Sequence, residues 1–328
     1  MFDFIENYKF KKESYLIKLC SSFLKAEESS SYLINKIKST TGLLRMRKGN
    51  PLIWGIITAL FPIDLYFKSR LYKYKALISL RIREWLEVWY NLEALSSLAN
   101  FAFLNPEYSF PEILQNKDEG MITFAGEQLA HPLIKSDSKI ANDFSFNQTS
   151  DIVIITGSNM SGKSTFIRTL GVNLLLAYAG SAVNAQSFKI SLFRLYTCIG
   201  ITDSLTNGIS YFYAEVKALR KLLDKAKLQG FPVFFLIDEI FRGTNNIERL
   251  KGSYAFLKAL AQTNVVGALA THDLELVKLS EEIHGIKNYH FKEEVKDGKM
   301  IFDYKLNTGP CPTTNALKIM KLEGLPIE

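Results

Sequence analysis

The sequence predicts an α/β protein in two parts: an all-α region over residues 1–112 and a mainly parallel sheet with covered faces over 113–328. Two observations support this. Apolar residues recur at helical spacing up to residue 104, and beyond it short apolar strands alternate with helical segments. A chain of 328 residues with 47% hydrophobic content is long enough for two domains with sizeable cores.

The first part is predicted to be helical until two prolines interrupt the pattern in residues 105–113. The run 64–104 contains neither Gly nor Pro and predicts one long helix. The stretch "KSTTGLLRMRKGNP" (38–51) predicts a break between helices. The apolar stretch 51–67 is shorter than the ~20 residues that span a bilayer. We therefore expect a buried helix there, with contact to a membrane surface as the alternative.

The distribution of charge indicates which partners this protein can have, and the spacing of its cysteines and histidines indicates which kinds of site it lacks. The net charge of +7 lies in residues 1–100, which hold 16 Lys and Arg against 9 Asp and Glu. This surplus fits either a solvated helical surface or a surface that faces a polyanion or a membrane. The three cysteines and four histidines lack the spacing of a zinc site or a disulfide framework. With no signal peptide at its start, the sequence suggests a reducing, cytoplasmic location.

The segment "TGSNMSGKST" (156–165) follows the apolar strand "DIVIIT" and precedes an apolar helix. It is either an ordinary strand-to-helix turn or a phosphate-binding loop with the pattern G-x-x-x-x-G-K-[ST]. In such a loop, backbone N–H groups surround the anion, the Lys reaches the β- and γ-phosphates and the Ser ligates Mg²⁺. The candidate nucleotide-binding residues are Gly157, Ser158, Asn159, Met160, Ser161, Gly162, Lys163, Ser164 and Thr165.

Two further strands end in polar residues. The buried strand "PVFFLIDE" ends in Asp238 and Glu239, and "ALATHD" ends in His272. Ligands of open α/β sheets bind at the carboxyl ends of the strands, so Asp238 can serve Mg²⁺ and Glu239 can activate water. The alternatives are two solvated acids and a structural histidine.

The stretch "DSLTNGISYFYAEV" (203–216) predicts a helix that begins at Ser210 as its N-cap. A helix N-terminus with a hydroxyl is a second anion site. Since one nucleotide does not need two such sites in one chain, we expect two chains to face each other. The alternative is that Ser210 only caps its helix.

These motifs occur in an order and at spacings that resemble the ATPase domain of the MutS family. The motifs are "TGSNMSGKST", "DSLTNGISYFYAEV", "LIDEIFRGTN" and "ALATHDLEL", with "HPLI" before them and "NALKIMKLEGLP" after them. The resemblance covers about residues 85–328. It implies a P-loop ABC-type ATPase domain that uses ATP and Mg²⁺, preceded by a helical lever or core domain. It also implies a homodimer with two composite nucleotide sites, whose ATP state is coupled to DNA binding in the full-length protein.

The resemblance also implies residue roles. Ser164 and Asp238 match the Mg²⁺ ligands, Glu239 and His272 match the catalytic residues, and Ser210 matches the serine that acts in trans on the partner's ATP. The dimer seam would contain Arg242, Gly243, Thr244 and Asn245.

The chain also departs from the family pattern. Ser158 replaces a proline, and residues 246–248 differ from the usual seam. Lys139 stands where an aromatic residue packs on adenine, so Ile140 is expected to contact the base. Two alternative functions are a nucleotide-dependent scaffold with little hydrolysis and a membrane-associated relative.

Overall fold

The structure, a computed structural model, describes residues 2–21, 23, 29–49, 55, 60, 62–114, 121–135, 137–200, 211–241, 243–296 and 299–312. The chain divides into two compact units, Met1–Ala99 and Asn100–Glu328. The boundary that the sequence suggested, after residue 112, lies at the start of the first strand of the second unit.

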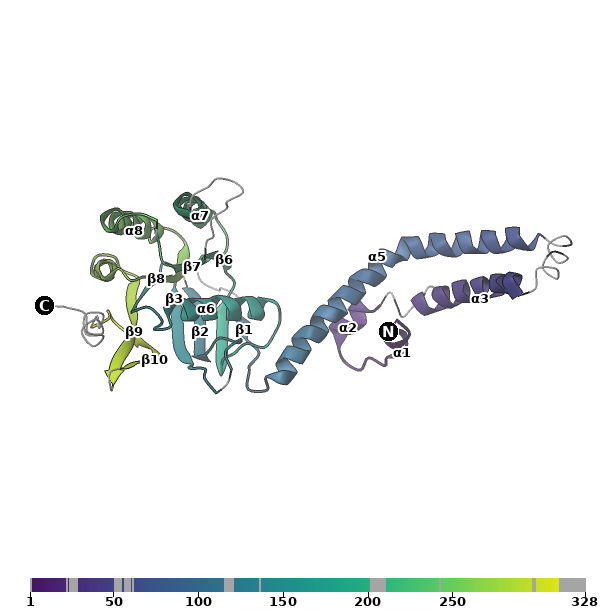
Figure 1. The fold of residues 1–328 in the computed structure, drawn as a ribbon, viewed down its shortest axis with the longest axis horizontal. Helices are drawn as coiled ribbons and strands as arrows, with labels where there is room; N and C mark the ends of the chain where they lie inside the picture. Colours follow the sequence, from purple (N-terminus) through teal and green to yellow (C-terminus); the bar gives the residue numbers. More distant parts are fainter. Residues whose placement is uncertain are drawn as a thin grey trace. The chain divides into compact units, whose positions relative to one another are not determined.

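The first unit is built from helices around a small apolar core. The described helices are α1 (Phe2–Asn7), α2 (Ser14–Leu19), α3 (Ser30–Gly49) and the long α5 (Ile63–Leu104), whose last residues belong to the second unit (Figure 1). The core centres on Trp85 of α5, which packs beside Phe23 with ring centroids 6.3 Å apart. The prediction of one long helix over 64–104 is therefore confirmed.

The predicted break over 38–51 is wrong for its described part, because α3 continues without interruption to Gly49. A glycine inside a helix costs only about 1 kcal/mol, and the first proline follows at residue 51, so Gly42 does not end the helix. The expected buried helix over 51–67 lies partly outside the described residues. Within the described part, Leu60, Leu65 and Tyr66 are exposed, which contradicts burial there. Among the described residues, no helix is long and apolar enough to cross a bilayer.

The second unit contains a six-stranded main sheet with the order β10-β9-β4-β8-β7-β6. All its neighbouring strands are parallel except β9 and β10, which form an antiparallel hairpin. The prediction of a mainly parallel sheet is thus confirmed for this sheet. Its strands are β4 (Ile152–Thr156), β6 (Arg194–Cys198), β7 (Val233–Asp238), β8 (Val265–Ala270), β9 (Ile286–Lys296) and β10 (Lys299–Thr308).

A second, small sheet has the order β1-β5-β2-β3, and in it only β1 and β5 pair in parallel. The sequence showed its strands as short and apolar, but not that they would separate from the main sheet. Strand pairing depends on long-range register, which a local pattern does not contain. The strands are β1 (Glu112–Leu114), β2 (Met121–Leu129), β3 (Asn142–Gln148) and β5 (Ser187–Ser191).

The main sheet is covered on both faces, as its continuous apolar strands require. Alternate residues of β4 point to opposite faces: Val153 and Ile155 join a core with the small sheet and helix α6, and Ile152 and Ile154 join a core with α7 and α8. These helices are α6 (Lys163–Tyr178), α7 (Tyr211–Ala226) and α8 (Asn246–Leu260), followed by the 3-10 helix η3 (Leu274–Lys278) and α9 (Leu279–Glu282).

The parallel order fixes where polar residues collect. β4, β8 and β7 are adjacent, and the carboxyl ends of parallel strands lie at the same edge of a sheet. We call the end of these three strands the carboxyl edge of the main sheet. The predicted loop follows β4, the two acids end β7, and the predicted histidine follows β8.

Candidate functional site

The loop 157–165 leaves β4 at the carboxyl edge and leads into α6 through a backbone that requires glycine. Gly157 has a φ of +144° and Gly162 a φ of +112°. A Cβ at Gly157 would lie 2.7 Å from the carbonyl oxygen of Phe291 and 2.9 Å from Ser161 Oγ. Such close approach leaves room only for a hydrogen atom. The loop therefore brings backbone N–H groups and the N-terminus of α6 to one concave place.

The Ser161 hydroxyl lies beside Gly157, 2.9 Å from the position that a Cβ there would take. It is fully buried, and Ser161 Oγ has no hydrogen-bond partner among the described residues. A buried hydroxyl without a partner costs free energy, so an acceptor such as a phosphate oxygen would stabilise it. Met160 is 84% exposed, and Asn159 and Thr165 are also exposed.

Lys163, the first residue of α6, folds back over the loop. Its Nζ donates to the carbonyl oxygens of Gly157 at 2.8 Å and Ser158 at 2.6 Å. Burial lowers the pKa of Lys163 to about 8, although the nearby carboxylates of Glu239 and Asp238 oppose this shift. Both hydrogen-bond partners that this amine has in the described part of the chain are neutral carbonyls, so the buried cation is well suited to receive an anion.

Ser164 and Asp238 form the part of the site that can hold a divalent cation. Ser164 Oγ donates to Asp238 Oδ1 at 2.9 Å, and Arg168 lies 3.9 Å from the other carboxylate oxygen. No group of three His, Cys, Asp or Glu side chains able to hold a metal occurs in the described part of the chain. Mg²⁺ commonly takes one or two protein ligands together with water and phosphate oxygens, so one carboxylate and one hydroxyl fit Mg²⁺.

Glu239 and His272 meet beside this pair. His272 Nε2 lies 3.1 Å from Glu239 Oε1. The contact follows from register, because Asp238 at the end of β7 pairs with Ala270 at the end of β8. The Glu239 N–H donates to the Ala270 carbonyl at 2.9 Å, and Glu239 has a left-handed φ of +60° that turns the chain out of the sheet.

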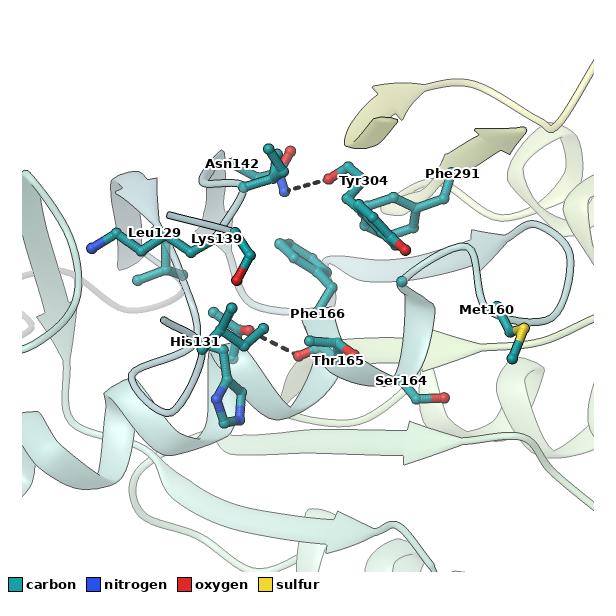
Figure 2. Close-up of a pocket in the computed structure, with 15 residues that line it drawn as sticks. Leu129, His131, Lys139, Asn142, Met160, Ser164, Thr165, Phe166, Phe291 and Tyr304 are labelled. Atoms are coloured by element: carbon teal, nitrogen blue, oxygen red, sulfur yellow. Dashed lines mark hydrogen bonds between the residues drawn. The ribbon is translucent and has the colours of Figure 1, made fainter. Parts of the chain in front are cut away.

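A pocket of about 440 Å³ opens between the loop, the β2–β3 connection and the β9–β10 hairpin (Figure 2). Ile140 lines it and is 42% exposed. Lys139 also lines it, but its ammonium group reaches Glu107 at 3.4 Å and lies over the ring of Tyr108.

The pocket also contains residues that sequence reasoning did not assign to the nucleotide site, among them Tyr304 and Asn142. Tyr304 comes from β10, and its ring would lie 3.3 Å from a Cβ at Gly162. Asn142 fixes that strand, since its Nδ2 donates to the Tyr304 carbonyl (Figure 2) and its Oδ1 accepts from the Leu306 N–H. These partners lie more than 160 residues apart in the sequence, so no local pattern signals them.

The predicted seam is described only in part. Ser210 and Arg242 lie outside the described residues, as does the predicted C-terminal motif within residues 313–328. Asn245 caps α8, because its side chain accepts a hydrogen bond from the Glu248 N–H at 2.9 Å. Thr244 in turn donates to the Glu248 carboxylate at 2.7 Å. These two hydrogen bonds connect Thr244 and Asn245 to the first turn of α8.

Comparison with known proteins identifies relatives of this part of the chain. Residues 153–328 match the family model described as MutS domain V. The DNA mismatch repair protein MutS of Aquifex pyrophilus is 36% identical over 208 residues, which are 62% of this chain and 24% of that protein. The proteins of the same name from Lactobacillus johnsonii and Clostridium tetani are each 31% identical over 72% of this chain. The chain spans about a quarter of the length of these relatives.

Proposed function

Because the chain belongs to the MutS family, we propose that its second unit is a P-loop ABC-type ATPase domain that binds ATP and Mg²⁺ and hydrolyses ATP to ADP and phosphate. One observation carries the proposal: Ser164 Oγ and Asp238 Oδ1 are 2.9 Å apart, and the Glu239–His272 pair lies at the same edge of the sheet. Four side chains from three separate segments thus provide a cation site beside an acid–base pair.

The loop 157–165 supports binding of the phosphates. Its backbone N–H groups and the Ser161 hydroxyl, for which no described residue is a partner, can donate to phosphate oxygens. Lys163 can exchange its two carbonyl partners for the β- and γ-phosphates, whose charge favours the protonated amine. The pocket of about 440 Å³ beside the loop accepts the base, with Ile140 and Tyr304 as its apolar walls.

Glu239 and His272 support hydrolysis. Mg²⁺ held by Ser164 and Asp238 would neutralise charge on the phosphates. The Glu239 carboxylate accepts a proton from the attacking water, and His272, in contact with Glu239 Oε1, orients that carboxylate.

The family resemblance supports a homodimer, in which Ser210 contacts the ATP of the partner subunit. Ser210→Arg should abolish hydrolysis, and so should Lys163→Ala. Mixing the two variants should restore phosphate release, because one composite site then has an intact loop and an intact Ser210. A flat response at concentrations that support wild-type dimers would refute the shared site. If Ser210 only caps its helix, the variant loses about 1 kcal/mol of stability and mixing restores nothing.

Coupling of ATP state to DNA binding and a cytoplasmic location are further parts of this proposal. The first rests on the family resemblance and the second on composition.

A second candidate function is association with a membrane surface. The outward residues Leu65, Tyr72 and Leu80 of α5 are 61–79% exposed, and lysines at 68, 73 and 75 flank them. Flotation of the 328-residue chain with anionic vesicles tests this candidate, and recovery in the vesicle-free fraction would refute it.

The decisive experiment for ATPase activity measures phosphate release with Mg²⁺ by the wild type and by Glu239→Gln. The variant should bind ATP normally and hydrolyse it about 10²–10⁴ times more slowly, the range expected for loss of a general base. Glu275→Gln, at an exposed acid that pairs with Lys278, is the matched control and should retain full activity. Hydrolysis by Glu239→Gln at the wild-type rate would assign the water activation to another residue.

A further inference from the structure

An ion pair between α8 and the turn after β8 lies directly beside the Glu239–His272 contact. Arg249 of α8 donates through Nε to Asp273 Oδ2 at 2.8 Å and through its second amine to Oδ1 at 2.6 Å. The two side chains are only 25% and 18% exposed. The planar guanidinium matches the carboxylate with two parallel hydrogen bonds, so the pair fixes orientation as well as distance.

The turn that Asp273 anchors contains His272. The Asp273 N–H donates to Thr271 Oγ1 at 3.0 Å, and the Thr271 N–H donates to the Ile155 carbonyl of β4 at 3.0 Å. Both sequence neighbours of His272 are therefore held by hydrogen bonds, Thr271 to the main sheet and Asp273 to α8. This leaves the imidazole, whose Nε2 is 3.1 Å from Glu239 Oε1, little freedom to move away from the carboxylate.

The other partner, Arg249, is one residue after Glu248, which the cap of α8 holds in place. A small cavity of about 80 Å³ lies against this arrangement and is lined by Glu239, Ile240, Arg249, Thr271, His272 and Asp273. The Arg249–Asp273 ion pair therefore borders the cavity next to Glu239 and His272. It also connects these two residues to the first turn of α8.

We propose that Arg249 and Asp273 are positioning residues. Their bidentate ion pair holds the His272 side chain in contact with Glu239 and connects the position of His272 to the N-terminal turn of α8. The inference rests on the proposed ATP hydrolysis only where it predicts how the loss of this ion pair changes kcat. A shift of about 1 Å in a reacting group can lower a rate up to about 100-fold, so loss of the pair should reduce kcat without changing nucleotide affinity.

The test compares Asp273→Asn and Arg249→Gln with the wild-type chain. Each variant should lower kcat for phosphate release about tenfold or more, while the Kd for ATP changes less than about twofold. Arg249→Lys keeps the charge but loses the fork of donors, so it should retain an intermediate kcat. Arg220→Gln, which breaks the exposed ion pair with Asp224 on α7, is the control and should behave as wild type.

A second readout does not depend on turnover. The chain has four histidines, so the ring signals of His272 can be assigned by NMR with a His272→Gln variant. Both single variants should shift these signals, while Arg220→Gln should not. Unchanged His272 signals in Asp273→Asn and Arg249→Gln would overturn the inference, as would an equal loss of ATP affinity and kcat. If the wild type releases no phosphate, the proposed ATPase function fails, and the NMR result still decides the positioning role.

Discussion

The carboxyl edge of the main sheet and the long helix α5 differ in how firmly their surroundings hold each residue. Every residue of β4, β7 and β8 is buried, with helices or the small sheet on both faces. In α5, by contrast, large apolar residues are exposed, Leu80 to 79%, and the buried core of the first unit is small. The residues of the candidate site come from the carboxyl edge of the main sheet, from the start of α6 and from neighbouring connections, and none of those named above comes from α5.

The difference shows where chemistry can be built. The Ser164–Asp238 contact at 2.9 Å and the Glu239–His272 contact at 3.1 Å depend on a backbone that holds its position. Strands that are buried on both faces provide such a backbone. A helix with one solvated face tolerates substitution there and presents a surface for partners. Two predictions compare the two regions and a third tests the pocket beside the sheet, in order of decreasing effect.

The largest contrast is in stability. Leu236→Ala in β7 should lower the free energy of unfolding by about 2–5 kcal/mol, because the side chain is fully buried and a cavity remains. Leu80→Ala in α5 should change it by less than about 0.5 kcal/mol. Denaturant unfolding of both variants measures the difference. Equal losses would show that α5 is as tightly packed in solution as the sheet.

A smaller effect concerns the pH dependence of ATP binding. Burial lowers the pKa of Lys163 to about 8, so the amine is charged at pH 7 and loses its proton as the pH rises above 8. ATP affinity should therefore fall at higher pH, by at most about tenfold per pH unit. Calorimetric titration from pH 7 to 9.5 measures this fall.

Two variants serve as controls for the role of Lys163. Lys163→Arg should remove the pH dependence, because arginine stays charged throughout this range. Lys75→Ala on the exposed face of α5 should leave the wild-type curve unchanged. The same shift affects folding: between about pH 8 and 10.5 the unfolded chain binds a proton at Lys163 that the folded chain lacks. This group therefore makes the protein more stable as the pH rises through that window.

The smallest effect tests the base pocket. Ile140→Ala should weaken ATP binding about fivefold, since it removes roughly 1 kcal/mol of apolar contact from a half-exposed side chain. It should not weaken tripolyphosphate binding, because that ligand lacks a base. Leu133→Ala, at an 83% exposed position of the same connection, is the control. Equal loss for both ligands would remove Ile140 from the base site.

The sequence by itself determined the elements whose pattern is local. The loop 157–165 was found from its glycines and lysine between a strand and a helix, and Asp238, Glu239 and His272 were found because each follows a continuous apolar run. Parallel strands must end at one edge, so the convergence of these residues followed as well. Gly42 misled the same reasoning, because the cost of a glycine inside a helix is small compared with the contacts that hold α3 in place.

Only the tertiary structure decided which distant segments complete the site. It brought Tyr304 over the loop, where Asn142 donates a hydrogen bond to the Tyr304 carbonyl, and joined Arg249 to Asp273 beside His272. It also separated the small sheet from the main one. These contacts depend on strand register and on helix packing against a finished sheet. Arg249 and Asp273 are 24 positions apart, and Asn142 and Tyr304 are more than 160 positions apart. Such residues come into contact only after both segments have packed on the same core, so no local spacing in the sequence predicts the contact.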